Sequence, residues 1–83
     1  MKLSHELQKK LSRLYEPSSF IQMKFRGDDV GFKTDDKGNA VLLFIGKADK
    51  NGQIKGSRYK RVLKFDTKGN KIKDHWELKG KAS

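Results

Sequence analysis

The sequence predicts an α+β fold in which one N-terminal helix packs on a five-stranded antiparallel β-meander. Two observations predict it. Leucines recur at helical spacing within the first 15 residues, and from residue 20 onward strand-like segments alternate with clusters of Asp, Lys, Gly and Asn. A chain of 83 residues is long enough for one small core and too short for two. We therefore expect residues 1–83 to form a single small domain.

The helix is expected at residues 4–15. Four leucines fall on one helical stripe, at spacings of four, four and three residues: Leu3, Leu7, Leu11 and Leu14. Ser4 can cap the start of the helix, and Pro17 prevents its continuation. The pattern is too short for a coiled coil, so the stripe is expected to pack on a sheet.

Five strands are expected after the helix, at residues 20–26, 30–34, 39–48, 54–65 and 71–78. The turns at residues 35–39 and 66–70 have nearly the same sequence, and residues 49–52 resemble both. In each, Asp can accept backbone N–H groups while Gly or Asn adopts a positive φ. A calcium loop is the less favoured interpretation, because the later oxygen ligands and the bidentate Glu are missing.

The strand at residues 39–48 has apolar side chains on both faces and is therefore expected to be central. Val41, Leu43 and Ile45 point one way, and Leu42 and Phe44 point the other. We expect one sheet face to hold Leu42, Phe44, Tyr59, Leu63, Ile72 and Trp76. One helix covers only one side of a sheet, so a strongly curved sheet, a half-open barrel or a partner subunit must cover the other.

The last hairpin has two candidate registers. A four-residue loop at residues 66–69 places Arg61 opposite Asp74 on the apolar face and Lys64 opposite Lys71 on the other face. A three-residue loop ending in a Gly bulge shifts the pairing by one and mixes the faces. We expect the four-residue loop, with an Arg61–Asp74 ion pair near the margin of the apolar face, because a fully buried pair carries a desolvation penalty.

Positive charge is concentrated in the second half of the chain. Residues 47–83 carry 12 Lys and Arg against four Asp and Glu, and the net charge of the whole chain is +10. The predicted register gathers five cations on one face, with Lys55 and Lys79 extending the stripe: Arg58, Lys60, Lys64, Lys71 and Lys73. Like charges opposite one another are mildly destabilising, which favours an anionic partner, although long lysines can also splay apart in water.

These observations predict a small basic module that contacts the backbone of DNA or RNA without strong sequence specificity. Most aromatic rings are assigned to the core, so no platform for stacking bases is expected. The alternative is a protein-interaction module that docks an acidic partner or forms a homodimer through the sheet face around Val41, Leu43 and Ile45. Binding to an anionic membrane surface ranks behind both, because no apolar anchor accompanies the charge.

Several function classes are disfavoured. The sequence has no cysteine, no Ser/His/Asp set and no phosphate loop, so we expect neither an enzyme nor a bound cofactor. Its two histidines, His5 and His75, lie on different elements, and no metal site is expected. The longest apolar run, residues 40–45, is too short to span a membrane, and the N-terminus lacks the features of a secretory signal, which predicts a cytoplasmic location.

Overall fold

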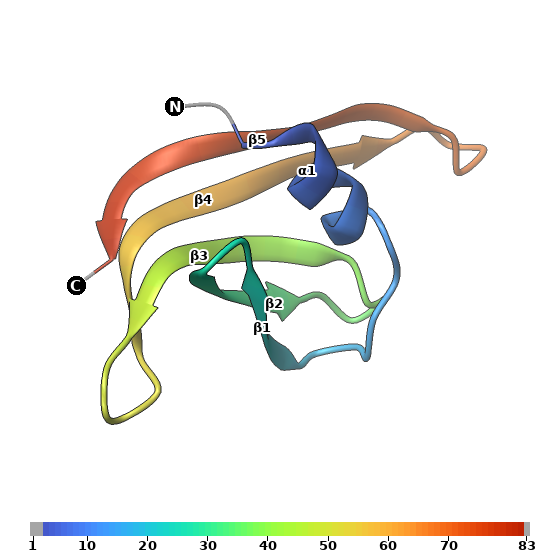
Figure 1. Cartoon of the computed structure of the whole chain (residues 1–83). Coiled ribbons are helices and arrows are strands. Elements are labelled where there is room, and N and C mark those ends of the chain that lie inside the picture. The colour runs from blue at the N-terminus through green and yellow to red at the C-terminus, as the bar shows by residue number, and fades with distance from the viewer. Residues whose placement is uncertain (1–2, 83) are drawn as a thin grey trace.

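A computed structural model describes residues 3–82 of the chain (Figure 1). One helix, α1 (His5–Leu11), precedes five strands: β1 (Phe20–Phe25), β2 (Asp28–Thr34), β3 (Ala40–Ala48), β4 (Ile54–Phe65) and β5 (Lys71–Ala82). The strands form one sheet in the order β1-β2-β3-β4-β5, each antiparallel to the next. This confirms the predicted helix and five-stranded antiparallel sheet. Within residues 3–82 the edge strands β1 and β5 do not pair with each other, so the sheet is not closed.

The helix begins as predicted and ends earlier than predicted. The Ser4 side chain accepts a hydrogen bond from the Leu7 backbone N–H at 3.1 Å, which caps the first turn. α1 stops at Leu11, and Leu14, expected on the buried stripe, is 69% exposed. Leu14 instead forms an isolated bridge with Asn39 in the turn between β2 and β3, because the chain here pairs with that turn rather than continuing as a helix. No helix in the described part of the chain has the length and apolar character that a membrane crossing requires.

Three turns share one geometry, each opened by an aspartate: Asp35, Asp49 and Asp66. The Oδ1 atom of each accepts backbone N–H groups from the residues two and four positions later, at 2.8–3.0 Å. The backbone N–H of each Asp also donates to the carbonyl four residues on. The glycine at the fourth position has a φ of 81–88°. This is a three-residue loop ending in a left-handed Gly, so the four-residue loop expected between β4 and β5 was wrong.

A second irregularity restores the predicted faces of that hairpin. Phe65 lies opposite Lys71, but Lys64 lies opposite Lys73, which leaves Ile72 as an extra residue that is 65% exposed. The loop and the bulge together shift the register by two residues from the prediction. Side chains alternate with a period of two, so a shift of two residues leaves each side chain on its predicted face, both in β4 and in β5 beyond the bulge. Every cross-strand pair, however, differs from the prediction. Arg61 thus lies opposite Trp76 instead of Asp74.

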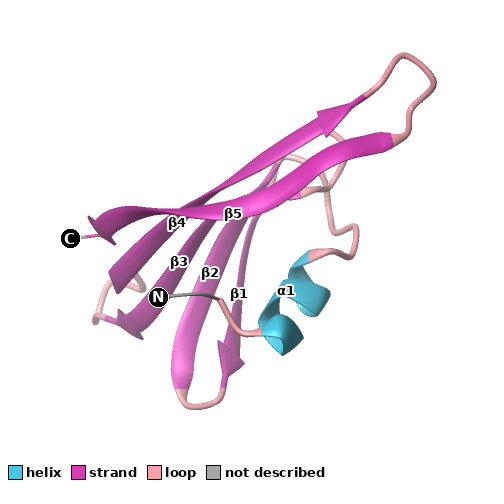
Figure 2. Ribbon diagram, turned by 90° about the horizontal axis from the view of Figure 1, so that it is seen from above, coloured by secondary structure: helices cyan, strands magenta, loops and turns pink. Residues whose placement is uncertain are grey.

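The helix covers one face of the sheet (Figure 2). The core between them consists of eight buried side chains: Leu3, Leu7, Leu11, Val30, Phe32, Ala40, Leu43 and Tyr59. Leu43 is completely buried there, and Val41 and Ile45 are half-buried, so α1 covers much of the face predicted for a homodimer; the homodimer stays a prediction.

The other face of the sheet, called the open face below, carries Leu42 and Phe44. Leu42 lies opposite Lys60, and Phe44 lies opposite Arg58. The prediction that Leu42 and Phe44 share a face with Tyr59 and Trp76 was therefore wrong. Arg58 and Lys60 of β4 thus lie on the same side of the sheet as Leu42 and Phe44 of β3, and α1 lies on the opposite side.

Candidate functional site

Four of the five predicted cations lie together on the open face. They are called the basic row below: Arg58, Lys60 and Lys64 of β4, and Lys73 of β5. All four are exposed, and Lys64 and Lys73 lie directly opposite each other. Within residues 3–82, no carboxylate lies within 4.0 Å of their charged groups. The basic row is thus a set of like charges without internal compensation.

The remaining predicted cations are engaged elsewhere. Lys71 Nζ lies 3.1 Å from Asp74 Oδ2, the carboxylate that also binds Arg61, so Lys71 belongs to the ion pair on the helix side. Lys79 Nζ lies 3.0 Å from Glu77 Oε1. Lys55 Nζ lies at the limit of an ion pair, 4.0 Å from Asp49 Oδ2. The structure therefore brings together Arg58, Lys60, Lys64 and Lys73, and separates Lys71 from them.

One carboxylate, Glu77, lies beside the basic row and is already compensated. Hydrogen bonds from His75, at 2.9 Å, and from Lys79 lower the pKa of Glu77 to about 2. Glu77 lies opposite Lys60 in the register, yet its two oxygens bind His75 Nε2 and Lys79 Nζ. Lys60 therefore keeps its charge free for an external ligand.

Two aromatic rings form a pair on the same face. The centroids of Phe20 and Phe44 are 6.3 Å apart with the ring planes inclined at 56°, and Phe20 remains 47% exposed. Gly31 lies beneath Phe20, because a Cβ atom at Gly31 would come within 2.6 Å of Phe20 Cζ and within 2.8 Å of Ile54 Cδ1. The glycine thus leaves the space in which an exposed ring rests against the sheet.

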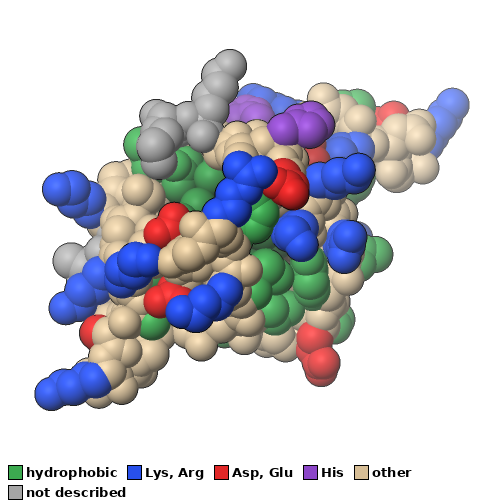
Figure 3. All heavy atoms as spheres, viewed as in Figure 1, with side chains coloured by type: hydrophobic (Ala, Val, Ile, Leu, Met, Phe, Trp, Pro, Cys, Tyr) green, Lys and Arg blue, Asp and Glu red, His purple; other side chains and the backbone are tan. Residues whose placement is uncertain are grey.

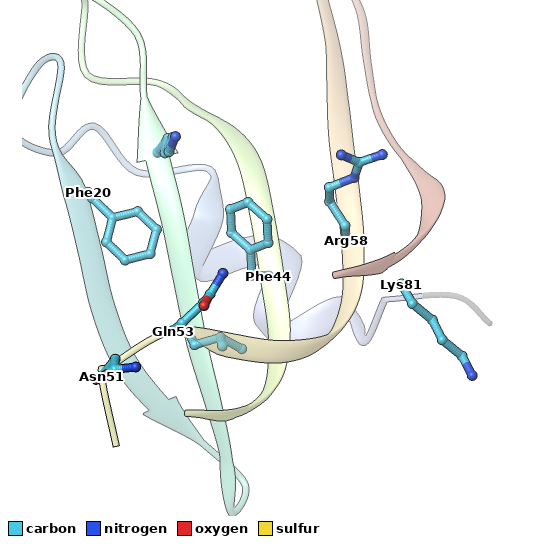
Figure 4. Close-up of a pocket in the computed structure, with 9 residues that line it drawn as sticks. Phe20, Phe44, Asn51, Gln53, Arg58 and Lys81 are labelled. Carbon is cyan, nitrogen blue, oxygen red and sulfur yellow. The ribbon is translucent and has the colours of Figure 1, made fainter. Parts of the chain in front are cut away.

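The aromatic pair lines an open groove of about 530 Å³ (Figure 4). Three cations line it, from three different strands: Lys33, Arg58 and Lys81. The turn between β3 and β4 adds the amide side chains of Asn51 and Gln53. Figure 4 shows the two rings side by side, with Gln53 below and between them and Arg58 on the neighbouring strand. The groove therefore combines apolar faces, amide groups and positive charge.

Sequence reasoning missed this groove because it placed Phe44 in the core. The position of Phe44 could have been derived from the turn at residues 49–53, which has the same Asp and Gly chemistry as the other two turns. If Asp49 pairs with Gln53, the register places Phe44 opposite Arg58 and so on the basic face. The sequence analysis assigned most rings to the core, whereas Phe20 is 47% exposed.

Charge alone does not distinguish the open face. On the side that carries α1, Lys and Arg side chains also project around the surface, between Asp, Glu and hydrophobic side chains (Figure 3). The distinguishing features of the open face are the directly opposed cations Lys64 and Lys73 and the aromatic pair beside the basic row. Among residues 3–82 there is no group of three His, Cys, Asp or Glu side chains placed to hold a metal ion.

Comparisons give no family or relative from which a role can be transferred: no protein-family model, no curated protein and no solved structure matches the chain.

Proposed function

We propose that the chain is a nucleic-acid-binding module that holds the phosphate backbone on the open face of its sheet. The observation that carries the proposal is the basic row, four exposed cations without a carboxylate partner, two of them directly opposed. Phosphates placed between Lys64 and Lys73 would remove the repulsion that the free protein tolerates. In this proposal the protein is a binding module rather than an enzyme, it requires no cofactor, and it acts in the cytoplasm on DNA or RNA.

The shape of the open face belongs to the same proposal. We infer that the sheet curves around the groove as a half-open barrel does. Gln22 Nε2 of β1 donates to the Gly52 carbonyl in the turn between β3 and β4, at 2.9 Å, although these segments are not neighbours in the sheet order. Gly46 and Gly56 lie opposite each other where a Cβ on either would meet the backbone of the other strand. A concave surface would bring cations from several strands toward one bound strand.

The alternative function is docking of an acidic protein on the same face. The basic row alone would serve an acidic peptide as well as a phosphate chain, because both present regularly spaced negative charge. The aromatic pair, in which Phe20 is exposed and Phe44 half-buried, favours nucleic acid, because proteins use rings beside cations to hold bases and phosphates together.

The proposal is tested by fluorescence polarisation with labelled single- and double-stranded DNA and RNA at two salt concentrations. We expect micromolar or tighter binding that weakens steeply with salt, and a loss of affinity in Lys64→Glu/Lys73→Glu. The matched control is Arg13→Glu/Lys37→Glu, which changes the net charge equally at exposed positions outside the open face.

Two results would contradict the proposal. One is the absence of binding at low salt. The other is an equal loss of affinity in both variants, which would mean that net charge and not the open face determines binding.

A further inference from the structure

We propose that the groove beside the basic row selects single-stranded nucleic acid by receiving an unpaired base against Phe20 and Phe44. This inference rests on the proposed function and adds to it a ligand class, a strand with accessible base faces. It also specifies which residues contact bases and which contact phosphates.

The aromatic pair is positioned to contact a planar base. Phe20 lies over Gly31 and against Ile54, and about half of its surface is still exposed. Phe44 lies 6.3 Å from it, with the two ring planes inclined at 56°. A planar base can therefore lie against Phe20 and meet the edge of Phe44. Exposed aromatic rings are costly in water, and a bound base would cover this one.

Polar side chains around the two rings can contact the other parts of a nucleotide, namely the edge of its base and its phosphates. The Asn51 and Gln53 side chains can donate to and accept from the edge of a base. Lys33, Arg58 and Lys81 line the same groove and can meet the phosphates on either side of that base. From Arg58 the cations continue along β4 through Lys60 to Lys64, which provides a path for the backbone away from the groove.

A duplex cannot use this groove in the same way. Its base faces are covered by neighbouring base pairs, so only its grooves and backbone are offered to a protein. Duplex binding would thus depend on the basic row alone, whereas a single strand would gain stacking in addition. Stacking of one base on an aromatic side chain contributes about 1 kcal/mol or more, which corresponds to about fivefold in affinity.

The test compares a labelled thymidine strand of about 12 nucleotides with an abasic strand of the same length and charge, and with a duplex of the same sequence. A uridine strand added to the series separates RNA from DNA through its 2′-hydroxyl groups. The protein variants are Phe20→Leu/Phe44→Leu and, as the matched control, Phe65→Leu. Phe65 is an equally exposed ring, 46% against 47% for Phe20, at the far end of β4.

We expect the wild type to bind the thymidine strand at least about fivefold more tightly than the abasic strand. This preference should disappear in Phe20→Leu/Phe44→Leu, with affinity for the abasic strand unchanged, and persist in Phe65→Leu. Thermal unfolding checks that the variants fold. Should the double variant fail to fold, the wild-type comparison of the thymidine and abasic strands decides alone.

The outcomes separate this inference from the proposed function. Equal, salt-dependent binding of the thymidine and abasic strands by the wild type would overturn the base-binding role while leaving the basic row as a backbone site. No binding of any strand at low salt would overturn both. A preference for thymidine that survives in the folded double variant would overturn the assignment to Phe20 and Phe44.

Discussion

Arg61 is the residue at which β4 contacts three other elements of the fold. Its guanidinium donates to both oxygens of Asp74 on β5, at 2.6 and 2.7 Å, and to the Ala40 carbonyl of β3 at 3.2 Å. The same group approaches the carbonyl of Leu11, the last residue of α1, at 3.4 Å. A cation at this position also interacts favourably with the negative end of the helix. The side chain is 2% exposed, whereas Asp74 lies at the margin with 24%.

Replacement of Arg61 should therefore destabilise the fold strongly. Arg61→Met removes the charge, leaves Asp74 without its main partner and frees two buried carbonyls. We expect a loss of about 3–5 kcal/mol in the free energy of unfolding, measured by urea denaturation. Lys60→Met, at an exposed neighbouring position on the open face, should change it by less than about 0.5 kcal/mol. Similar losses in the two variants would contradict the central role of Arg61.

The same ion pair makes stability depend on pH. Hydrogen bonds from Arg61 hold the pKa of Asp74 below its usual value, outweighing the opposing effect of burial. A carboxylate whose pKa is lowered in the folded state contributes stability above its unfolded pKa and loses that contribution as the pH falls through its folded pKa. The stability from Asp74 should thus be present at neutral pH and decline below about pH 4.

The measurement is the free energy of unfolding of the wild type and Asp74→Asn between pH 7 and pH 2. We expect the variant to be less stable at pH 7 and to lose less stability on acidification, so that the two curves converge at low pH. Asp36→Asn, at an exposed turn position, is the control for the loss of one carboxylate. Parallel curves for wild type and Asp74→Asn would contradict the role assigned to this carboxylate.

Among the elements of the fold, the repeated turns offer an internal comparison. Gly38 and Gly69 occupy the same position of two nearly identical turns, with φ of 88° and 85°. A Cβ at Gly69 would meet nothing within 4 Å, whereas a Cβ at Gly38 would lie 2.2 Å from the Tyr15 carbonyl oxygen. The turn between β2 and β3 is therefore tied to the segment that follows α1, and the turn between β4 and β5 is free.

Gly69→Ala should cost about 1 kcal/mol, the strain of placing a side chain at positive φ. Gly38→Ala carries the same strain and in addition displaces the backbone at Tyr15, so we expect a clearly larger loss. Thermal or urea unfolding of the two variants measures the difference, and Gly69→Asn should recover part of the loss because Asn tolerates the left-handed region. An equal cost at both positions would contradict the contact between Gly38 and Tyr15.

The elements also show how much of the fold the sequence predicted. The helix, the five strands and the side-chain faces of β4 follow from periodicity, which is a local property. The register of the last hairpin does not follow from periodicity, because it depends on both a three-residue loop and a bulge at Ile72. The alternation of side chains gives no sign of that bulge. The early end of α1 depends on the pairing of Leu14 with Asn39, which no local pattern reveals.

The candidate site was predicted in part for the same reason. The basic row follows from alternation within β4, since Arg58, Lys60 and Lys64 all have even numbers and share a face. The aromatic pair requires the register between β3 and β4 and the placement of Phe20 over Gly31, which are non-local. Lys71 was assigned to the row because the prediction omitted the bulge that directs it toward Asp74.

At the scale of the whole molecule, the proposed binding would depend on both the net charge and the shape of the open face. The net charge of +10 attracts any polyanion and raises the rate of encounter, and salt screens this attraction. Because cations also surround α1 (Figure 3), long-range attraction does not by itself orient the ligand. In the proposed function, orientation would come from short-range contacts with the basic row and the groove on the open face.

Two arginines allow this central claim to be tested directly. Arg58 is exposed on the open face, whereas Arg61, three residues later in β4, is buried under α1 and paired with Asp74. The measurement is a two-dimensional NMR titration of the labelled protein with a short single-stranded DNA, following the arginine Nε–H signals and the backbone amides. We predict that the Nε–H signal of Arg58 and the amides of residues 51–53 shift with added strand, while the Nε–H signal of Arg61 and the amides of α1 do not. Shifts concentrated in α1, with the signal of Arg58 unchanged, would show that the ligand binds the opposite side of the sheet and would contradict the proposed site.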